Sequence, residues 1–259
     1  MNERSPALLV SVRDALEARA ALDGGCDILD IKEPERGSLG RADFAQTQSI
    51  ITLACGFAAL HGEPRSTGSI PISAALGEAL DWLDAKAPPQ IPSGLTYIKI
   101  GTAGLGQSAS WPHDWRMAFS QLSCAGNAPR LIIVANADWR PAEGPSPRAV
   151  IEAATDLGCD GVLIDTHRKD GRGLFDWLTM SELIELALLA RQSKLQFALA
   201  GSLTLADVPR LLEISPDIAG IRTAACRDGE RNGPIDADAV RQFRNVLFGM
   251  SLEDRSTRV

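Results

Sequence analysis

The sequence lacks long apolar stretches. No run of ~18 apolar residues, about the length that a membrane-spanning helix requires, occurs in the 259 residues. The segment Met1–Val12 has neither the apolar core nor the small-residue cleavage site of a signal peptide. We therefore expect a cytoplasmic protein that does not enter a membrane.

Positive charge is also in short supply. The chain has 26 Lys and Arg against 33 Asp and Glu, which gives a formal net charge of −7. Proteins that bind the backbone of nucleic acids gather Lys and Arg on one face. We expect no nucleic-acid partner, and an anionic ligand would require a local basic pocket.

Closely spaced metal ligands are missing as well. The cysteines are odd in number and scattered, and the histidines are far apart: Cys26, Cys55, Cys124, Cys159 and Cys226; His61, His113 and His167. Zinc sites and disulfide frameworks use closely spaced pairs. We predict reduced thiols, no metal site and no bound cofactor.

Short apolar runs rich in β-branched residues alternate with longer stretches of helical period. This order predicts a parallel sheet with crossover helices. The expected strands are Leu8–Ser11, Ile28–Lys32, Ile72–Leu76, Tyr97–Ile100, Leu131–Ala135, Val162–Asp165, Phe197–Ala200 and Ile218–Arg222. Eight such strands, each followed by a helix, predict an α/β fold of the single-domain (β/α)8 TIM-barrel type.

A doubly wound open sheet would also alternate strands and helices, but it favours a G-x-G-x-x-G turn after its first strand. Ser11-Val12-Arg13-Asp14 occupies that place here. No linker rich in Pro, Gly or Ser divides the chain. We expect one catalytic barrel domain over residues 1–250 and a polar tail over residues 251–259.

Helix boundaries support this division. Ser11-x-x-Asp14 and Thr179-x-x-Glu182 have the spacing of capping boxes, and Gly24-Gly25 predicts the end of the first helix. Apolar residues at helical spacing predict faces that pack on the barrel: Leu183, Leu186 and Ala190; Val240, Phe243 and Leu247.

Charged residues stand at the ends of three predicted strands. Alternate residues of a strand share a face, so Asp30 and Lys32 point into the barrel while Ile31 points outward. Lys99 ends the fourth strand, Asp165 ends the sixth, and Lys169 follows in the next loop. Barrel enzymes place catalytic groups at this rim, so we predict that these residues form the active site.

Clustered amines in a partly dry cavity repel one another and lose solvation, which lowers the pKa of at least one of them. The neutral amine can then attack a carbonyl and form a Schiff base, and a nearby carboxylate can transfer the protons. Each charge could instead be a surface residue or an ion-pair partner, as most Lys and Asp are. His167, between Asp165 and Lys169, could touch the substrate.

Barrels commonly bind phosphate in the loops after strands seven and eight. Gly201 and Ser202 follow the seventh predicted strand, and Arg222 ends the eighth. Glycine permits close backbone approach, serine donates a hydrogen bond and arginine supplies a charged fork. We predict that these three residues bind a substrate phosphate.

Several segments resemble the (5-formylfuran-3-yl)methyl phosphate synthase family. The most specific begins at Asp30-Ile31-Lys32-Glu33-Pro34 and ends at Gly37-Ser38-Leu39-Gly40; Pro71–Gly77, Tyr97–Gly101 and Ile164–Gly171 continue the likeness. The segments Leu105–Trp115 and Trp139–Pro145 depart from the shorter archaeal members.

The resemblance implies a barrel enzyme that condenses two molecules of glyceraldehyde 3-phosphate, with loss of phosphate and water, to 4-(hydroxymethyl)-2-furancarboxaldehyde phosphate. This product is a precursor of methanofuran or an analogue. It also implies that Lys32 forms the Schiff base, that Lys99 accepts a proton, and that Asp30, Asp165 and Lys169 are supporting charges.

Two other functions stay open at this stage. Another Schiff-base aldolase or an isomerase of small sugar phosphates can also use Asp-x-Lys on a barrel strand, and a barrel without activity can bind a sugar phosphate for regulation. The expected partner in each case is a small phosphorylated compound. A homo-oligomer is compatible with the sequence, which does not fix the oligomeric state.

Overall fold

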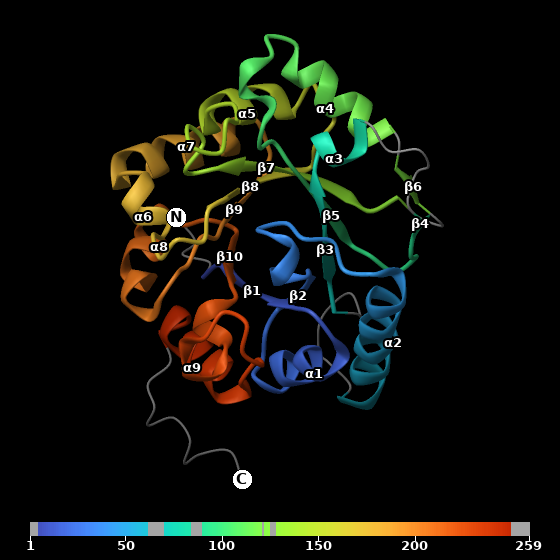
Figure 1. Ribbon diagram of the computed structural model, residues 1–259. Helices are drawn as coiled ribbons and strands as arrows, with labels where there is room; N and C mark the ends of the chain where they lie inside the picture. The colour runs from blue at the N-terminus through green and yellow to red at the C-terminus, as the bar shows by residue number, and fades with distance from the viewer. Residues whose placement is uncertain (1–4, 62–69, 84–89, 121, 125–127, 250–259) are drawn as a thin grey trace.

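A computed structural model describes residues 5–61, 70–83, 90–120, 122–124 and 128–249. Parallel strands close into a barrel in the order β1-β10-β9-β8-β7-β5-β3-β2 (Figure 1). These strands are β1 (Ala7–Val12), β2 (Ile28–Ile31), β3 (Ile72–Glu78), β5 (Tyr97–Gly101), β7 (Arg130–Asn136), β8 (Gly161–Asp165), β9 (Gln196–Leu199) and β10 (Ile218–Ile221). Each predicted strand overlaps one of these observed strands, so the predicted (β/α)8 barrel is confirmed. The predicted tail, residues 251–259, lies outside the described part of the chain.

Helices surround the barrel (Figure 1). They are α1 (Ala15–Asp23), α2 (Phe44–His61), α3 (Leu80–Leu83), α4 (Trp111–Ser120), α5 (Pro147–Ala154), α6 (Leu174–Trp177), α7 (Met180–Gln192), α8 (Val208–Ile214) and α9 (Ala237–Leu247). Short 3-10 turns are η1 (Pro34–Arg36), η2 (Leu105–Gln107), η3 (Leu205–Asp207), η4 (Thr223–Ala225) and η5 (Arg227–Gly229). Of the helices that the structure describes, none has the length and apolar character needed to cross a membrane.

A small parallel pair, β4 (Gln90–Ile91) with β6 (Ser123–Cys124), was not predicted. Each strand has only two residues, which is too short for a two-residue periodicity to be recognised in the sequence.

The hydrophobic core has two parts. The larger part lies between the strands and the helices and includes the predicted faces of α7 and α9, whose residues Leu183, Ala190, Val240 and Phe243 are fully buried. The smaller part fills the barrel interior with side chains such as Ile28, Tyr97, Ile132, Leu163 and Ile218. A barrel filled in this way is a solid support for charged groups at its mouth.

The two predicted capping boxes had different outcomes. Thr179 caps α7, and its hydroxyl and backbone N–H both bond Glu182, as predicted. The prediction for Ser11 was wrong, because β1 continues to Val12 and the carboxylate of Asp14 caps α1 by accepting the N–H of Glu17 at 2.9 Å. Ser11 is therefore a strand residue whose side chain is available for another contact.

Candidate active site

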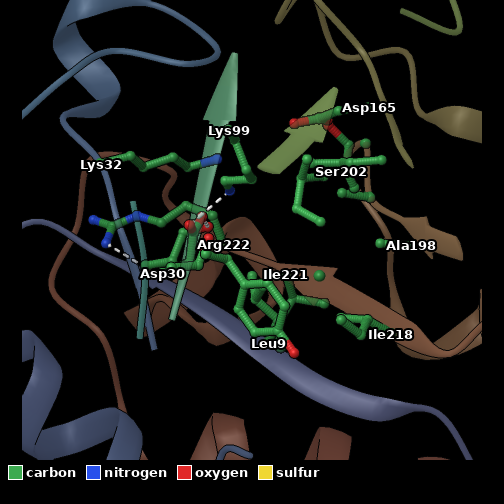
Figure 2. A pocket seen from close by; sticks show the side chains of 18 of the residues that line it. Leu9, Asp30, Lys32, Lys99, Asp165, Ala198, Ser202, Ile218, Ile221 and Arg222 are labelled. Atoms are coloured by element: carbon green, nitrogen blue, oxygen red, sulfur yellow. Dashed lines mark hydrogen bonds and ion pairs between the residues drawn. The ribbon is translucent and has the colours of Figure 1, made fainter. Parts of the chain in front are cut away.

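One cavity opens at the carboxyl ends of the barrel strands (Figure 2). The structure brings all the predicted site residues to its wall: Asp30, Lys32, Lys99, Asp165, Lys169, Gly201, Ser202 and Arg222. They come from β2, β5, β8, β9 and β10 or the residues that follow them. Segments far apart in the sequence meet here because every parallel strand ends at the same rim.

Lys32 follows β2 directly and is 6% exposed. Its backbone N–H bonds the carbonyl of Val12 at 3.0 Å, so the residue continues the line of the strand. Asp30 and Lys32 face the cavity while Ile31 packs in the outer core, as the alternation predicted. The predicted placement of both charges is confirmed.

The amine of Lys32 has an unusual pKa. Burial lowers it to about 7, and the opposing attraction of Asp165 and Asp30 only partly offsets this effect. Among the described residues, no carboxylate oxygen lies within 4.0 Å of Lys32 Nζ. A large fraction of Lys32 is therefore neutral near pH 7, which a nucleophilic amine requires.

Asp30 forms a buried pair with Lys99. Asp30 Oδ1 lies 2.6 Å from Lys99 Nζ, and these side chains are 1% and 5% exposed. The contact crosses over β3, which lies between β2 and β5 in the barrel. Asp30 Oδ2 accepts a hydrogen bond of 2.8 Å from Ser11 Oγ. Oδ2 of Asp30 is thus fixed by a hydrogen bond, whereas Oδ1 meets Lys99 as an ion pair without hydrogen-bond geometry.

A second pair lies at the end of β8. Lys169 Nζ bonds Asp165 Oδ1 at 3.1 Å, the carbonyl of Thr166 at 2.5 Å and the Thr166 hydroxyl at 2.9 Å. Burial alone would raise the pKa of Asp165, but the charges of Lys169 and Lys32, with hydrogen bonds from Lys169 and the Thr166 N–H, lower it to about 2. Asp165 is a carboxylate at every physiological pH and holds Lys169 at the rim.

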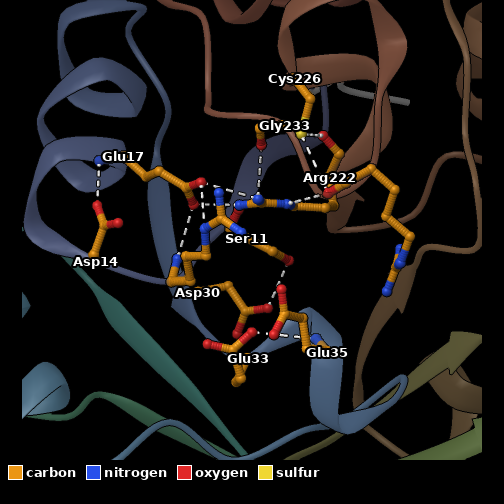
Figure 3. Close-up of polar contacts among 11 residues, drawn as sticks. Ser11, Asp14, Glu17, Asp30, Glu33, Glu35, Arg222, Cys226 and Gly233 are labelled. Atoms are coloured by element: carbon orange, nitrogen blue, oxygen red, sulfur yellow. Dashed lines mark hydrogen bonds and ion pairs between the residues drawn. The ribbon is translucent and has the colours of Figure 1, made fainter.

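Arg222 differs from the prediction in what its side chain contacts. Its guanidinium is buried and bonds both oxygens of Glu17 and the carbonyls of Ser11, Arg231 and Gly233 (Figure 3). A guanidinium has five N–H groups, and each has a protein acceptor here. Arg222 cannot donate to a phosphate without breaking a buried bond, so its place in the site is that of a support.

The glycine turn after β9 has the backbone that close approach requires. Gly201 has φ of 107°, and a Cβ there would lie 3.0 Å from the Thr166 side chain. Ser202 follows with φ of 52°, in the left-handed region that is uncommon for serine. Both residues line the cavity, so the predicted position of this turn is confirmed, while its role in phosphate binding stays a prediction.

His167 contacts a residue at the end of β3. Its Nδ1 lies 3.5 Å from Glu78 Oε1, at the limit of a hydrogen bond, and it does not line the cavity. The contact with Glu78 raises the pKa of His167. Asp138 fixes the loop by accepting the backbone N–H groups of His167 and Arg168 at 2.7 and 2.8 Å.

Sequence reasoning missed several residues of the cavity wall: Ser11, Ser73, Tyr97, Thr223 and Arg231. Ser73 was accessible to prediction, because a hydroxyl on the inward row of a predicted strand is unusual. Ser11 was assigned to a helix cap instead. Arg231 lies in a polar loop with no periodic signal, where only the tertiary structure shows its position.

The described residues contain no group of three or more His, Cys, Asp or Glu side chains that could hold a metal ion. Cys26 and Cys159 are buried at points where a helix leads into a strand.

Comparison with known protein families gives a specific match. The model of the 4-HFC-P synthase family matches residues 8–244. A (5-formylfuran-3-yl)methyl phosphate synthase of Methanococcus maripaludis strain C7 is 34% identical over 245 residues, which cover 92% of this chain and 98% of the relative. The synthase of that name from Archaeoglobus fulgidus is 31% identical over 251 residues, which cover 93% and 99%.

Solved structures resemble the fold at low identity. A crystal structure of KGPDC from Streptococcus mutans aligns with a TM-score of 0.51 and 13% identity, over 95% of this chain and 99% of that one. Phosphoribosyl anthranilate isomerase from Thermus thermophilus aligns with a TM-score of 0.54 and 13% identity, over 94% and 99%. These likenesses concern the barrel alone. The family model and the archaeal relatives confirm the resemblance seen in the motifs: this chain is an enzyme of the 4-HFC-P synthase family, the (5-formylfuran-3-yl)methyl phosphate synthases.

Proposed function

We propose that the protein condenses two molecules of glyceraldehyde 3-phosphate to 4-(hydroxymethyl)-2-furancarboxaldehyde phosphate through a Schiff base on Lys32. One phosphate and two waters leave, which balances the atoms. The proposal places the enzyme in the biosynthesis of methanofuran or an analogue. The observation that carries the mechanism is the buried amine of Lys32, whose pKa is lowered to about 7 in a cavity with two flanking ion pairs.

The first step is attack of the neutral Lys32 amine on the aldehyde of one triose phosphate. The resulting hydroxyl leaves as water when it receives a proton, and the protonated imine then draws electrons from the neighbouring carbon. This imine performs the role of electron sink, so the mechanism requires no cofactor. Loss of a proton from the neighbouring carbon gives an enamine, which attacks the second aldehyde.

The Asp30–Lys99 pair is suited to move the protons. The Lys99 ammonium donates the proton with which water leaves, and the neutral amine that remains accepts the proton from the carbon next to the imine. Asp30, held by Ser11, stays beside Lys99 throughout this cycle. Lys99 in this role is the proton acceptor, and it returns to the ammonium form without taking a proton from solvent.

The Asp165–Lys169 pair has a separate role in the proposed mechanism. Lys169 attracts a phosphate by its charge and not by a free N–H, since Asp165 and Thr166 accept all three of its hydrogen bonds; the 3.1 Å contact with Asp165 fixes its position. Phosphate is then lost, a substrate hydroxyl adds to the imine carbon and closes the ring, and the Lys32 amine leaves from that carbon. Loss of the second water forms the aromatic furan, whose stability draws the sequence to completion.

The test is incubation of the purified protein with glyceraldehyde 3-phosphate. Phosphate release and the ultraviolet band of a conjugated furaldehyde are followed together, and a borohydride-quenched sample is mapped by mass spectrometry. The expected result is furan, phosphate and a reduced adduct on Lys32, with no adduct on the exposed Lys194, which serves as an internal control. Lys32→Ala should remove turnover.

Other outcomes separate the alternatives. An adduct on Lys32 without furan points to a different Schiff-base aldolase or isomerase of small sugar phosphates. Full activity in Lys32→Ala overturns the mechanism. Binding of the substrate with neither adduct nor product favours a barrel that only binds sugar phosphates.

A further inference from the structure

The loop after β10 carries a second arginine that faces the same cavity as Lys32. Arg231 lines the cavity, and its Nη2 is buried without a hydrogen-bond partner among the described residues. Buried donors are nearly always paired, so a donor left over in a cavity wall indicates a group that a ligand completes. Arg222, on the same side, has no N–H left to offer.

The charge of Arg231 is not neutralised by the protein. Among the described residues, no carboxylate oxygen lies within 4.0 Å of its guanidinium. Burial lowers the pKa of Arg231, and the nearby charge of Arg222 adds to this effect, while Asp165 opposes it. A guanidinium stays protonated in proteins, so the site holds a half-buried cation that an anion would stabilise.

Arg222 holds the backbone that carries Arg231. Arg222 Nε donates to the carbonyl of Arg231 at 3.1 Å, and Arg222 Nη2 donates to the carbonyl of Gly233 at 3.1 Å. The loop is closed at its base by the antiparallel bridge between Cys226 and Ile235. Because Arg222 is anchored in turn by Glu17, the position of Arg231 is set by a buried ion pair.

The surrounding wall is suited to a phosphate. Gly201, Ser202, Gly220 and Thr223 line the same cavity as Arg231 and contribute small side chains and two hydroxyls. A planar guanidinium can bind two phosphate oxygens at once, which a lysine cannot do. This combination favours a phosphate monoester over a carboxylate or a neutral sugar.

We propose that Arg231 binds a phosphate group of the substrate and that Arg222 acts as the positioning residue that holds it there. The inference rests on the proposed function in one respect, namely that the substrate is a phosphorylated aldehyde.

The test compares Arg231→Gln with Arg227→Gln, a matched variant of an exposed arginine in the same loop. Binding of inorganic phosphate is measured by titration calorimetry, and the rate of borohydride trapping on Lys32 is measured with glyceraldehyde 3-phosphate and with glyceraldehyde. Arg231→Gln should weaken phosphate binding and slow trapping of the phosphorylated aldehyde by about ten- to a hundredfold, the range for loss of a charged hydrogen bond. Trapping of glyceraldehyde and the behaviour of Arg227→Gln should not change.

Two results overturn the inference: phosphate binding in Arg231→Gln equal to that of the unmodified protein, or an equal loss of trapping with both aldehydes. If Arg231→Gln does not fold, Arg231→Lys is used in the same comparison, and it should lose most of the phosphate affinity because it lacks the fork. Absence of furan from the unmodified protein, with phosphate bound through Arg231, refutes the proposed function and leaves this inference standing.

Discussion

Ser11 Oγ donates a 2.8 Å hydrogen bond to Oδ2 of Asp30, whose other oxygen lies 2.6 Å from Lys99 Nζ. Ser11 and Asp30 are direct partners in the register of β1 and β2, so their side chains project from neighbouring strands to the same face. The hydroxyl fixes the rotation of the carboxylate and thereby the direction in which it meets Lys99. The contacts of Ser11 also connect Asp30 to Arg222 and, through it, to Glu17 (Figure 3).

Ser11→Ala should lower kcat about tenfold and change KM little, because a buried hydrogen bond to a charged group contributes about 1.5 to 3 kcal/mol and its loss leaves Asp30 free to rotate. The measurement is steady-state kinetics, with urea unfolding to confirm that the fold persists. Ser181→Ala, which removes an exposed hydroxyl on α7, is the matched control and should leave kcat and KM unchanged. An unchanged kcat in Ser11→Ala would exclude a positioning role for this serine.

The value of kcat/KM should rise with pH through the pKa of Lys32. Burial lowers this pKa to about 7, and only the neutral amine attacks the aldehyde. The expected profile therefore climbs tenfold per pH unit below about 7 and levels off above it. Asp165, with a pKa near 2, is ionised throughout this range and adds no second limb. A flat profile between about pH 6 and 8 contradicts the assignment of Lys32.

Asp165→Asn and Lys169→Met should move this profile in opposite directions. The charge of Asp165 raises the pKa of Lys32 and that of Lys169 lowers it. Removal of the carboxylate therefore shifts the rise in kcat/KM to lower pH, and removal of the ammonium shifts it to higher pH. Both variants should lose activity, so the comparison uses the midpoint of the profile and not its height. Shifts of the same sign would show that neither charge acts on Lys32 directly.

Lys32→Met should stabilise the fold. The pKa of Lys32 falls from an ordinary 10.5 in the unfolded chain to about 7 in the folded protein, so the unfolded chain binds more protons between these values. Burial of Lys32 therefore lowers the free energy of unfolding at pH values below 10.5, and the loss is complete below about 7. We expect the free energy of unfolding at pH 7 to rise by roughly 2 to 4 kcal/mol. The gain should shrink as the pH approaches 10.5.

Urea unfolding at several pH values measures this effect. Lys194→Met, which replaces an exposed lysine, is the control, and its change in the free energy of unfolding should stay near zero. A destabilised Lys32→Met at neutral pH would contradict the pKa assigned to Lys32. A stabilised but inactive variant is the behaviour of a residue retained for function at the expense of stability.

Much of this molecule was accessible from the sequence. The apolar runs predicted every strand of the barrel because a strand buried on both faces needs a continuous apolar segment. Asp30, Lys32 and Lys99 stood out because a charge in such a segment is costly without a purpose. Their arrival at one rim followed from the common direction of parallel strands.

The contacts of those side chains were decided only by closure of the barrel. The Asp30–Lys99 pair spans β3, and Arg222 meets Glu17 because β10 closes against β1. Sequence spacing carries no information about these pairs, since each joins residues that are far apart along the chain. The predictions for Ser11 as a helix cap and for Arg222 as a phosphate ligand were wrong for the same reason, because both side chains contact residues that are distant in the sequence.

Local apolar patterning and strand direction are properties of the chain, so the sequence was enough to predict the barrel, its family and the rim on which the charges gather. Only the packed barrel shows which buried lysine has no carboxylate oxygen within 4.0 Å in the described part of the chain. It also shows that the N–H groups of Arg222 are bonded within the fold while Arg231 faces the cavity. Burial and pairing are set by the whole packed barrel, and they determine both the pKa of Lys32 and the unpaired donor of Arg231.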